Sequence, residues 1–454
     1  MTGQTLFLPV EIKKRELLGK ALLASVAAEA GHTSYLGEQN ELFDRLDRLP
    51  AGIYLEKVFT RAQARRLRRY ADLGLYIAGW DEEGLLYRNA EVYLNDRIAP
   101  EAFGLLDQFF AWGGVQQGDV IDNFKGSPPP ITPTGNPRFD LLRPEFREFF
   151  AGEAKALQAR YGNYILVNTN FGRINHVEGY DYAVKLREAR GTVGTPEARA
   201  RALRLDDYVR QNLDGLLAAL PAIEAAFPDH TVIVRPHPSE NVTTWRDAAA
   251  GLTRTHVLSE DNAIPWILGA DAIVHNSCTT SVEAFMLDVP RVAYNPFSTP
   301  EFDVELVNLI SAVAHDSDGL IAALKAVIAD GHAALDDDAA AIVERYISAR
   351  EGALACDNIL DVLAPVTPPQ RSAGKALINR LGGLAIRASR PLRWALNPTA
   401  QSDAYSRQKF DHLTLDEMTG ILDQFRAASG RFAGVEVNPV AGSTTCYRFS
   451  QRAG

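Results

Sequence analysis

The chain has 454 residues, of which 46% are hydrophobic and 23% are charged. These values are ordinary for a folded globular protein and exclude a disordered or collagen-like chain. The formal net charge of −10 argues against a dedicated nucleic-acid-binding protein, which would present a basic surface. Three widely separated cysteines with no CxxC pair predict neither a disulfide framework nor a zinc cluster. A reducing, cytoplasmic compartment is the simplest expectation.

Neither a membrane-spanning segment nor an export signal is expected. No run of 18 consecutive apolar residues occurs in the sequence. The first apolar run, residues 6–10, precedes the charged stretch 13–16, which is the reverse of the order in a signal peptide.

Short apolar runs alternate with helical patterns along most of the chain. The runs predicted as strands are 6–10, 33–37, 52–59, 76–80, 92–94, 109–112, 164–168, 231–235, 256–258, 272–275 and 291–294. This alternation predicts an α/β protein with two doubly wound, Rossmann-like domains facing a cleft. We place the domains at residues 1–155 and 156–365, followed by a C-terminal helical tail at 366–454.

The tail contains a basic amphipathic segment. Residues 371–396 carry six basic side chains and no acidic one, and apolar residues alternate with them. The segment is either a basic surface helix or linker packed on a domain, or an attachment to an anionic membrane face. Farther along, Thr414 and Glu417 form a capping-box pattern that predicts the start of a terminal helix.

Ligands of doubly wound domains bind at the carboxyl ends of the strands, and three predicted strand ends carry unusual residues. The first is the strand 231–235, which runs directly into Arg235-Pro-His237-Pro238. The two prolines flanking His237 stiffen the backbone and fix where the imidazole points. Arg235 and His237 together suit an anionic oxygen, especially that of a phosphate. The alternative is a rigid turn with a solvent-exposed histidine.

The second strand end is residues 272–275, after which a helix is predicted at once. Ser277, Thr279 and Thr280 place hydroxyl groups beside the N–H groups of that helix start, which is a favourable site for an anion. Capping alone is the other interpretation, because Thr280 and Glu283 have capping-box spacing. Glu283 is either a ligand contact or structural.

The third strand end, in the first half, is Asp81-Glu82-Glu83-Gly84. Adjacent like charges raise one another's pKa, which is one way to tune a general base or nucleophile. A solvated acidic turn is the other interpretation. The segments 11–16, 135–140 and 168–173 are expected to line the same region.

The three motifs together resemble those of bacterial GT-B glycosyltransferases of surface-polysaccharide assembly that use a CMP-activated nonulosonic acid. Sialyltransferases and Kdo transferases share an acidic motif, a His-Pro motif and a Ser/Thr motif in this order. Over residues 5–365 the chain is also loosely similar to surface carbohydrate biosynthesis proteins. Cys278 interrupts the Ser/Thr motif and Asp81 lengthens the acidic motif, so the identity of the base stays open.

The resemblance implies an acceptor-side first domain and a CMP-sugar-binding second domain, with an acidic residue as catalytic base and no metal ion. The His-Pro histidine and the Ser/Thr motif would bind the CMP phosphate, and Glu260 would hold the ribose. The catalytic candidates are Asp81, Glu82, Glu83 and His237. The donor-binding candidates are Arg235, His237, Glu260, Ser277, Thr279, Thr280 and Glu283.

The partners expected from the resemblance are a CMP-nonulosonate donor, a glycan or glycolipid acceptor and, through residues 371–396, an anionic membrane surface. The expected location is cytoplasmic, with or without peripheral attachment to the inner face of the membrane. Two alternatives remain open. One is a UDP-sugar epimerase or CDP-glycerol-type transferase on the same fold, and the other is a non-catalytic GT-B-like scaffold for polysaccharide assembly.

Overall fold

The computed structural model of the chain describes residues 3–189, 193–258, 262–332, 335–369 and 410–452. These residues form two compact units. Unit 1 takes its described residues from 1–85, 93–149 and 345–454, and unit 2 takes them from 86–92 and 150–344. Residues 345–365, predicted to lie in the second domain, therefore belong to unit 1. The described part of the predicted tail, 366–454, also belongs to unit 1.

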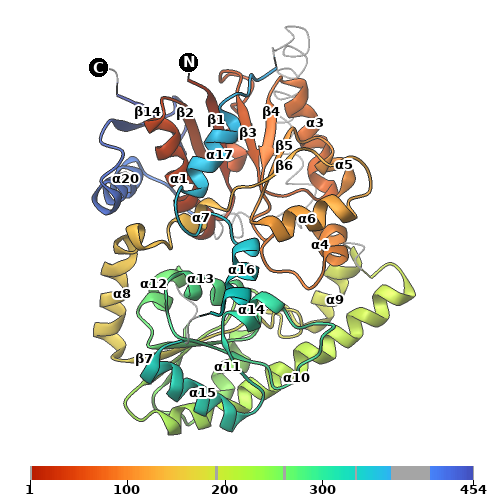
Figure 1. The fold of residues 1–454 in the computed structure, drawn as a ribbon, viewed down its shortest axis with the longest axis vertical. Helices are drawn as coiled ribbons and strands as arrows, with labels where there is room; N and C mark the ends of the chain where they lie inside the picture. The colour runs from red at the N-terminus through yellow and green to blue at the C-terminus, as the bar shows by residue number, and fades with distance from the viewer. Residues whose placement is uncertain (1–2, 190–192, 259–261, 333–334, 370–409, 453–454) are drawn as a thin grey trace. The chain divides into compact units, whose positions relative to one another are not determined.

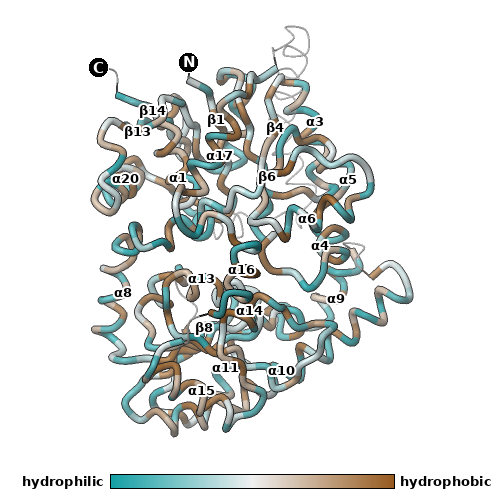
Figure 2. The backbone as a smooth tube through the Cα atoms, viewed as in Figure 1, coloured by the Kyte–Doolittle hydropathy of each residue, from teal (hydrophilic) through white to brown (hydrophobic). Residues whose placement is uncertain are grey.

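Unit 1 is built on an eight-stranded sheet with the order β13-β14-β2-β1-β3-β4-β5-β6. Its strands are β1 (Thr5–Val10), β2 (Thr33–Glu38), β3 (Ile53–Glu56), β4 (Tyr76–Gly79), β5 (Gln108–Ala111), β6 (Ile131–Pro133), β13 (Val435–Pro439) and β14 (Cys446–Gln451). Strands β1 to β6 are parallel, whereas β14 pairs antiparallel with β2 and with β13. Every residue of β3 and β5 is buried, and Figure 2 shows hydrophobic colour along β1 and β4. This is expected for parallel strands that are covered on both faces.

The helical elements of unit 1 are α1 (Lys13–Glu29), α2 (Gln39–Phe43), η1 (Arg61–Gln63), α3 (Ala64–Asp72), α5 (Pro100–Phe103), α6 (Gly114–Asn123), α7 (Pro137–Asp140), η2 (Pro144–Phe146), α17 (Ala355–Leu363) and α20 (Leu415–Ser429). Helix α1 is the most deeply placed, since every residue from Lys20 to Ala28 is buried. It contacts the helices α7, α17 and α20 and the strand β14, so elements far apart in the sequence pack against one helix (Figure 1). Helix α4 (Ala90–Arg97) begins in the unit 2 segment and ends in unit 1.

Unit 2 is built on a six-stranded parallel sheet with the order β12-β11-β10-β7-β8-β9. Its strands are β7 (Tyr164–Asn168), β8 (Thr231–Arg235), β9 (Thr255–Val257), β10 (Ala272–His275), β11 (Arg291–Tyr294) and β12 (Ala312–Ala314). Its helices are α8 (Glu148–Tyr161), α9 (Tyr180–Ala189), α10 (Pro196–Ala226), α11 (Val242–Ala248), α12 (Ala263–Leu268), α13 (Thr279–Met286), α14 (Glu305–Leu309), α15 (Ser317–Asp330) and α16 (Asp337–Tyr346), of which α8 and α16 each extend by two residues into unit 1. The strand order reverses at β7, between β8 and β10, which is the point where ligands bind in sheets of this topology.

Most predicted strands are confirmed, and one is wrong. Residues 92–94 are not a strand but lie within α4, whose first turn is capped by the Asn89 side chain through Val92 N–H (2.9 Å). A short apolar run does not by itself distinguish a strand from a buried helix segment. The terminal helix is confirmed as α20, with Thr414 accepting a hydrogen bond from the backbone N–H of Glu417. Strands β6, β12, β13 and β14 were not predicted.

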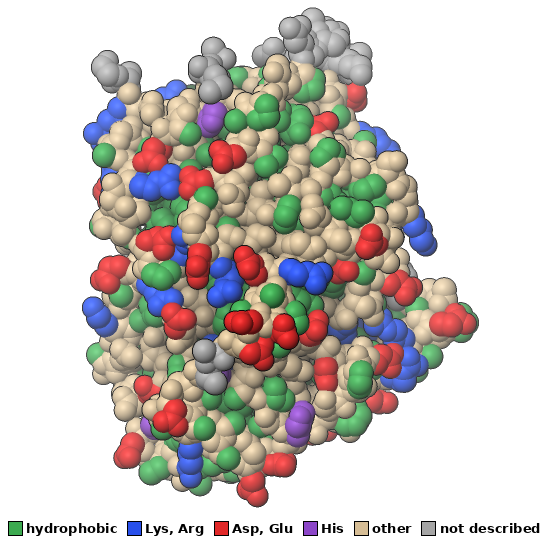
Figure 3. All heavy atoms as spheres, viewed as in Figure 1, with side chains coloured by type: hydrophobic (Ala, Val, Ile, Leu, Met, Phe, Trp, Pro, Cys, Tyr) green, Lys and Arg blue, Asp and Glu red, His purple; other side chains and the backbone are tan. Residues whose placement is uncertain are grey.

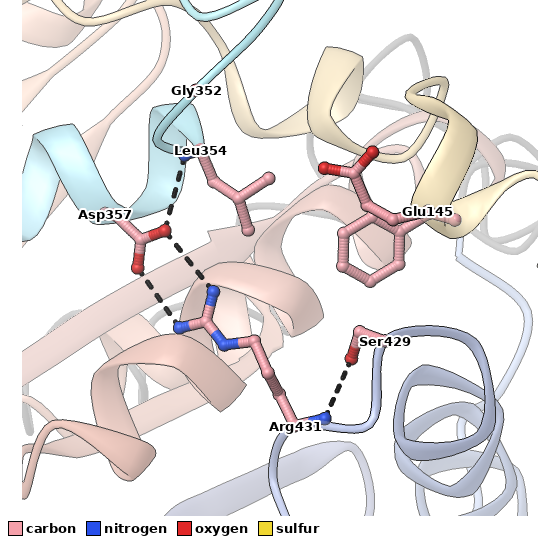
Figure 4. A pocket seen from close by; sticks show the side chains of 7 residues that line it. Glu145, Gly352, Leu354, Asp357, Ser429 and Arg431 are labelled. Atoms are coloured by element: carbon pink, nitrogen blue, oxygen red, sulfur yellow. Dashed lines mark hydrogen bonds and ion pairs between the residues drawn. The ribbon is translucent and has the colours of Figure 1, made fainter.

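The C-terminal elements are attached to unit 1 by ion pairs as well as by β14. Arg431 lies 2.8 Å from Glu29 and 3.1 Å from Asp357. Figure 4 shows Arg431 and Asp357 facing each other across a small pocket, with Ser429 and Glu145 at its other sides. Arg431 lies in the C-terminal segment, and both of its carboxylate partners lie elsewhere in unit 1. The ion pairs at this pocket therefore attach the C-terminal segment.

The surface shows no single dominant charge on the face drawn in Figure 3, where acidic and basic side chains are interspersed among hydrophobic ones. Among the helices of the described residues, none is long and apolar enough to cross a membrane. The basic segment 371–396 lies outside the described residues.

Candidate functional site

The sheet of unit 2 places two of the sequence motifs on either side of strand β7. Asn168, the last residue of β7, pairs in register with Arg235 at the end of β8 and with His275 at the end of β10. The Arg235–Pro238 loop and the turn before α13 therefore leave the sheet at the same edge. This edge is the switch point of the strand order, so the fold itself brings the two motifs together.

The His237 loop is held by a buried glutamate that the sequence analysis did not single out. Glu240 is 1% exposed, and it accepts hydrogen bonds from the Thr169 hydroxyl (2.6 Å), the His237 backbone N–H (3.0 Å) and the Trp245 indole N–H (3.0 Å). Gly172 also approaches closely, because a Cβ there would lie 2.1 Å from Ser239 Oγ. The loop is therefore held by the hydrogen bonds to Glu240 and by the close approach of Gly172.

These contacts also define which imidazole nitrogen of His237 carries the proton. The backbone N–H of Ser239 lies 3.2 Å from Nδ1 of His237, and a backbone N–H can only donate. Nδ1 is therefore an acceptor, and in the neutral ring the proton is on Nε2. His237 is exposed, so an anionic oxygen can reach its ring from solvent.

Arg235 is half-buried at the start of the same loop, and its guanidinium lies 5.6 Å from the centre of the Trp266 ring. Stacking on an aromatic ring limits the positions that the long side chain can occupy. The structure thus brings the predicted pair Arg235 and His237 to one strand end.

The Ser/Thr motif begins helix α13, but not as a capping box on Thr280. The helix starts at Thr279 with Cys278 as its N-cap residue, and no side-chain hydrogen bond caps it. Thr280 contacts the Cys278 thiol instead. The predicted capping box is therefore wrong, because the N-cap is Cys278 and the helix starts two residues earlier than a Thr280 cap would require. The first turn has no side-chain oxygen cap, as a site for an external anion requires.

The turn before α13 is strained at Ser277, whose φ of 45° lies in the left-handed region that favours glycine. Its hydroxyl oxygen is buried and makes no hydrogen bond within the described residues. A serine in such a conformation at a candidate site is a feature that ligand binding explains. Thr279 is exposed and Thr280 is half-buried, so both hydroxyls lie near the surface.

The remaining donor-binding candidates are Glu283 and Glu260, and His275 is a neighbouring residue. Glu283 is buried on α13, whereas Glu260 lies outside the described residues. His275 is fully buried, and burial together with the charges of Arg291 and His332 lowers its pKa to about 3. Its Nε2 lies 3.1 Å from Ser311 Oγ. His275 is therefore a neutral core residue and not a phosphate partner.

The acidic motif lies at the end of β4 in unit 1, where its three carboxylates have different surroundings. Asp81 is 1% exposed and receives both a 3.1 Å hydrogen bond from Arg97 Nε and a second contact from the same guanidinium. It also accepts from the Glu83 backbone N–H (3.2 Å), and its carbonyl accepts from the Trp112 indole (2.7 Å). Asp81 therefore organises the turn.

Glu83 is half exposed and pairs with Arg15 at 2.9 Å and Arg97 at 2.8 Å. Burial raises its pKa, but the charges of Arg97 and Arg15 outweigh this effect, so the pKa is lowered. The increase expected from three adjacent carboxylates does not occur at Glu83, because arginines neutralise the repulsion. A carboxylate with a lowered pKa is a weaker general base.

Glu82 is buried, with 2% of its side chain exposed, and is the least tightly paired of the three. Its nearest cations are Lys20 Nζ at 3.5 Å and Arg138 at 4.0 Å. One of its carboxylate oxygens, Oε2, makes no hydrogen bond within the described part of the chain. Among the three, Glu82 therefore has the carboxylate with the weakest pairing.

Beneath the acidic motif lies an ion network that the sequence did not reveal. Glu16, fully buried on α1, pairs with Lys20 at 2.9 Å and with Lys57 at 2.6 Å. Burial raises the pKa of Glu16, but the two lysines outweigh burial and hold it well below its usual range. Glu16 also accepts from the backbone N–H of Glu11 (3.1 Å), so the segment 11–16 closes the β1–α1 turn.

Gly84, the glycine of the acidic motif, is required by a close approach. A Cβ at Gly84 would lie 2.1 Å from Gln116 Nε2. Gln116 in turn holds the Tyr93 hydroxyl (2.7 Å) and the Trp112 backbone N–H (2.8 Å). The glycine therefore lets the acidic turn lie directly against this buried glutamine.

The segment 135–140, expected to line the binding region, has a different main role. Asp140 accepts hydrogen bonds from the backbone N–H groups of Ala355 (2.8 Å) and Cys356 (2.9 Å), and so caps α17. Burial raises the pKa of Asp140 to about 7, although these bonds oppose the increase. Only Arg138 reaches the acidic motif, through Glu82.

In the part of the chain that the structure describes, no three His, Cys, Asp or Glu side chains are grouped so as to hold a metal ion. The three cysteines are buried and free.

Comparison with known proteins identifies the fold. No family model and no curated protein matches the sequence. A crystal structure of UDP-N-acetylglucosamine 2-epimerase aligns over 81% of this chain and 98% of its own length, with 13% identity and a TM-score of 0.51. The UDP-GlcNAc 2-epimerase of Methanocaldococcus jannaschii, in complex with UDP-GlcNAc and UDP, covers 79% of this chain and 99% of its own, with 12% identity and a TM-score of 0.49. The wall teichoic acid polymerase TagF covers 80% of this chain and 87% of its own, with 10% identity and a TM-score of 0.47. With two doubly wound units and its likeness to the first of these structures, the chain has the GT-B-like fold predicted from its sequence.

Proposed function

We propose that the protein is a GT-B glycosyltransferase that moves a nonulosonic acid, Kdo or a sialic-acid-like sugar, from a CMP-sugar to a surface glycan or glycolipid acceptor. The observation that carries this proposal is the carboxyl edge of the unit 2 sheet. Arg235, His237 and the uncapped start of α13 leave this edge on both sides of β7.

The donor set at this edge suits a single phosphate group. It comprises a guanidinium, an imidazole N–H, the hydroxyls of the Ser277–Thr280 turn and a helix N-terminus. Such donors neutralise one phosphodiester charge by hydrogen bonding, so no metal ion is needed. A CMP-sugar has one phosphate, whereas UDP- and CDP-linked donors have two.

Glu82 is the residue we assign as the catalytic carboxylate. It would act as general base on the acceptor hydroxyl in an inverting reaction, or as nucleophile on the anomeric carbon in a retaining one. Glu82 Oε2 makes no hydrogen bond within the described residues and has only a long 4.0 Å ion pair with Arg138, which supports this assignment over Asp81, bound by Arg97, and Glu83, paired with two arginines.

The second candidate function is a UDP-sugar 2-epimerase, because the solved structure with a TM-score of 0.51 is a UDP-N-acetylglucosamine 2-epimerase. One fold hosts many activities, so the site must decide. The test is the melting temperature of the purified protein with CMP, UDP and CDP at equal concentration. Stabilisation by CMP above UDP and CDP supports the transferase. Preference for UDP supports the epimerase, and no response to any of them favours the scaffold.

His237 provides a direct test of the phosphate site. We expect His237→Ala to weaken CMP affinity by about 1.5–3 kcal/mol, the usual value of a hydrogen bond to a charged group. His256→Ala is the matched control, because His256 is also an exposed histidine at a strand of unit 2 but lies on β9. Equal CMP affinity of His237→Ala and the control by calorimetry would contradict the phosphate role.

We further propose that residues 371–396 bring the enzyme to an anionic membrane, where a lipid-linked acceptor would be found. Each basic residue near an anionic leaflet contributes about 1 kcal/mol before screening. The full chain and a full-length variant with the six basic residues of 371–396 replaced by glutamine can be compared by sedimentation with anionic liposomes at low and high salt, because both keep α20, β13 and β14 of unit 1. Equal, salt-independent sedimentation of the two forms would overturn this proposal.

A further inference from the structure

A short segment after the acidic motif belongs to unit 2, although the chain on both sides of it belongs to unit 1. Residues 86–92 form this segment. Leu86 packs against a buried apolar cluster of unit 2 made by Ala293, Val304 and Val307. This anchor places the following arginine, Arg88, among unit 2 side chains.

Arg88 is surrounded by cations. Its charge interacts with those of Arg173, in the loop after β7, and Arg201, on α10. Burial and the charges of the two neighbouring arginines together lower the pKa of Arg88 to about 10, with Tyr208 opposing them. Arg88 Nε is buried and makes no hydrogen bond within the described residues, where Arg88 also forms no ion pair.

The acidic residues near this cluster are already shared. Asp206 pairs with both Arg173 and Arg187. Glu301 pairs with Arg204 at 2.6 Å and lies 3.8 Å from Arg201. Asp206 and Glu301 are thus shared among four arginines, and Arg88 adds a fifth positive charge. The site therefore has an excess of positive charge that a bound anion would neutralise.

Tyr208 connects this cluster to the Ser/Thr motif. Its hydroxyl donates to Asp303 (2.8 Å). Burial and the bond to Asp303 raise the pKa of Tyr208, whereas the charge of Arg88 and the nearby hydroxyl of Ser277 lower it. Tyr208 therefore lies close to both Arg88 and Ser277, and the cluster adjoins the strained turn where the proposed phosphate site begins.

We propose that Arg88, Arg173 and Arg201 form a second anion subsite of unit 2, beside the Ser277 turn, that binds the carboxylate of the donor sugar. The inference rests on the proposed function. A nonulosonic acid bears its carboxylate on the same anomeric carbon that carries the CMP phosphate, so the donor presents two anions only a few bonds apart. The planar guanidinium groups of the arginines match a carboxylate with two parallel hydrogen bonds. Donors without a carboxylate, such as UDP-N-acetylglucosamine, would leave this cluster unneutralised.

The test compares the affinities of the full-length protein for CMP, CMP-Kdo and CMP-N-acetylneuraminate. In the wild type, at least one CMP-sugar should bind more tightly than CMP. Arg88→Gln should weaken binding of that CMP-sugar by about 10- to 100-fold, as loss of a charged hydrogen bond does, and leave CMP affinity unchanged. Arg88→Lys keeps the charge without the planar guanidinium and should give a smaller loss. Arg204→Gln is the control, because Arg204 shares Glu301 but is half exposed.

Circular dichroism establishes that each variant is folded, and Arg201→Gln serves as a second variant if Arg88→Gln does not fold. Equal weakening of CMP and CMP-sugar would overturn the inference in favour of a phosphate contact. Unchanged binding of both in the Arg88 and Arg201 variants would overturn it outright. If the wild type binds CMP but distinguishes no CMP-sugar from it, the carboxylate subsite fails while nucleotide binding stands. If the wild type binds no CMP compound, the proposed function fails and the subsite with it.

Discussion

The two units share a doubly wound architecture but have opposite chemistry at the carboxyl edges of their sheets. In unit 1 this edge is dense with paired charges, and Glu16, Asp81 and Glu83 each contact two basic groups or the two arms of one guanidinium. In unit 2 the edge is formed by neutral donors and by arginines that outnumber their carboxylate partners. The fold determines where a ligand can bind, whereas the residues at the strand ends determine which charge it must carry.

Burial has a different consequence in each unit because of these partners. The buried Glu16 of unit 1 stays ionised, since two lysines outweigh its desolvation. The buried His275 of unit 2 is neutral, since its neighbours Arg291 and His332 add to its desolvation. A buried charge with good partners gives a rigid support for a catalytic carboxylate, while an arginine cluster with too few carboxylates gives an anion site.

The largest expected effect concerns Glu82. We expect Glu82→Gln to lower the rate of sugar transfer by roughly 100-fold or more, as loss of a general base does, because Glu82 is the least tightly paired carboxylate of the motif. CMP affinity should be preserved, since Glu82 belongs to unit 1. Steady-state transfer rates together with CMP calorimetry measure both.

Glu83→Gln is the matched control for Glu82, since it removes a neighbouring carboxylate of the same length that is exposed and paired with arginines. We expect it to lower the rate by less than about 10-fold. A large loss in Glu83→Gln combined with a near-normal rate in Glu82→Gln would reverse the assignment. Asp81→Asn tests a different property, because loss of its pair with Arg97 should destabilise the turn.

Glu240 is the corresponding support in unit 2, and its loss should affect stability and binding together. Glu240→Ala leaves the Thr169 hydroxyl, the His237 N–H and the Trp245 indole without their acceptor. We expect a loss of about 2 kcal/mol in the free energy of unfolding, from buried donors left unsatisfied. CMP affinity should also fall, because the His237 loop is released.

Urea unfolding and CMP calorimetry measure these two effects. Glu178→Ala provides the control, since Glu178 is an exposed residue near the same loop. If Glu240→Ala is destabilised but binds CMP as tightly as the wild type, then Glu240 supports the core and not the site. If Glu240→Ala is as stable as Glu178→Ala, the network around Glu240 contributes nothing.

Most strands could be predicted from the sequence because buried parallel strands are continuous apolar runs. The motifs at strand ends were found for the same reason, since polar residues directly after such a run are conspicuous. The prediction of a strand at residues 92–94 was wrong because this apolar run is too short to show a helical or a strand periodicity. Strand β14 carries an alternating signal, with Tyr447 and Phe449 buried and Arg448 exposed, which could have been recognised as an antiparallel strand.

The residues that hold the site could not be predicted, because their partners are distant in sequence. Glu16 meets Lys57 only after β1 and β3 have paired, and Asp140 meets the first turn of α17 only after the chain returns to unit 1. Glu240 has no signature beyond its position three residues after His237. Which of the three acidic residues is least tightly paired also depends on arginines from elsewhere in the sequence, including Arg15 and Arg138.

Asp140 gives unit 1 a pH-dependent stability, because its pKa is raised in the folded chain. The pKa of an aspartate in the unfolded chain is about 4, and burial raises that of Asp140 to about 7 in the folded chain. Between these values the folded state keeps a proton that the unfolded state releases, so stability falls as pH rises from about 4 to about 7 and is level above that. We expect this group to contribute a decrease of about 1 kcal/mol or more across the window.

Asp140→Asn isolates this contribution, since the amide cannot titrate but resembles the protonated acid in shape. Unfolding free energies of the wild type and the variant, measured at intervals between pH 4.5 and 8, should differ in slope because all other groups titrate in both. The free energy of unfolding of the variant should therefore increase relative to that of the wild type as pH rises. Parallel curves would show that Asp140 is ionised throughout, and that the amides of Ala355 and Cys356 stabilise its charge fully.

The smallest expected effect is at Arg431, whose ion pairs belong to neither proposed site. Its side chain is one-third exposed, and it pairs with Glu29 and Asp357, each about one-third exposed. Exposed pairs of this kind contribute little, so Arg431→Met should lower the free energy of unfolding by less than about 1 kcal/mol. CMP affinity should not change, because Arg431 belongs to unit 1. Arg448→Met, which removes a longer and more exposed pair with Glu436, is the control. A loss several-fold larger in Arg431→Met would mean that the attachment of the C-terminal segment depends on this arginine more than on the pairing of β14 with β2, and that the charges of unit 1 stabilise its fold well beyond the acidic edge.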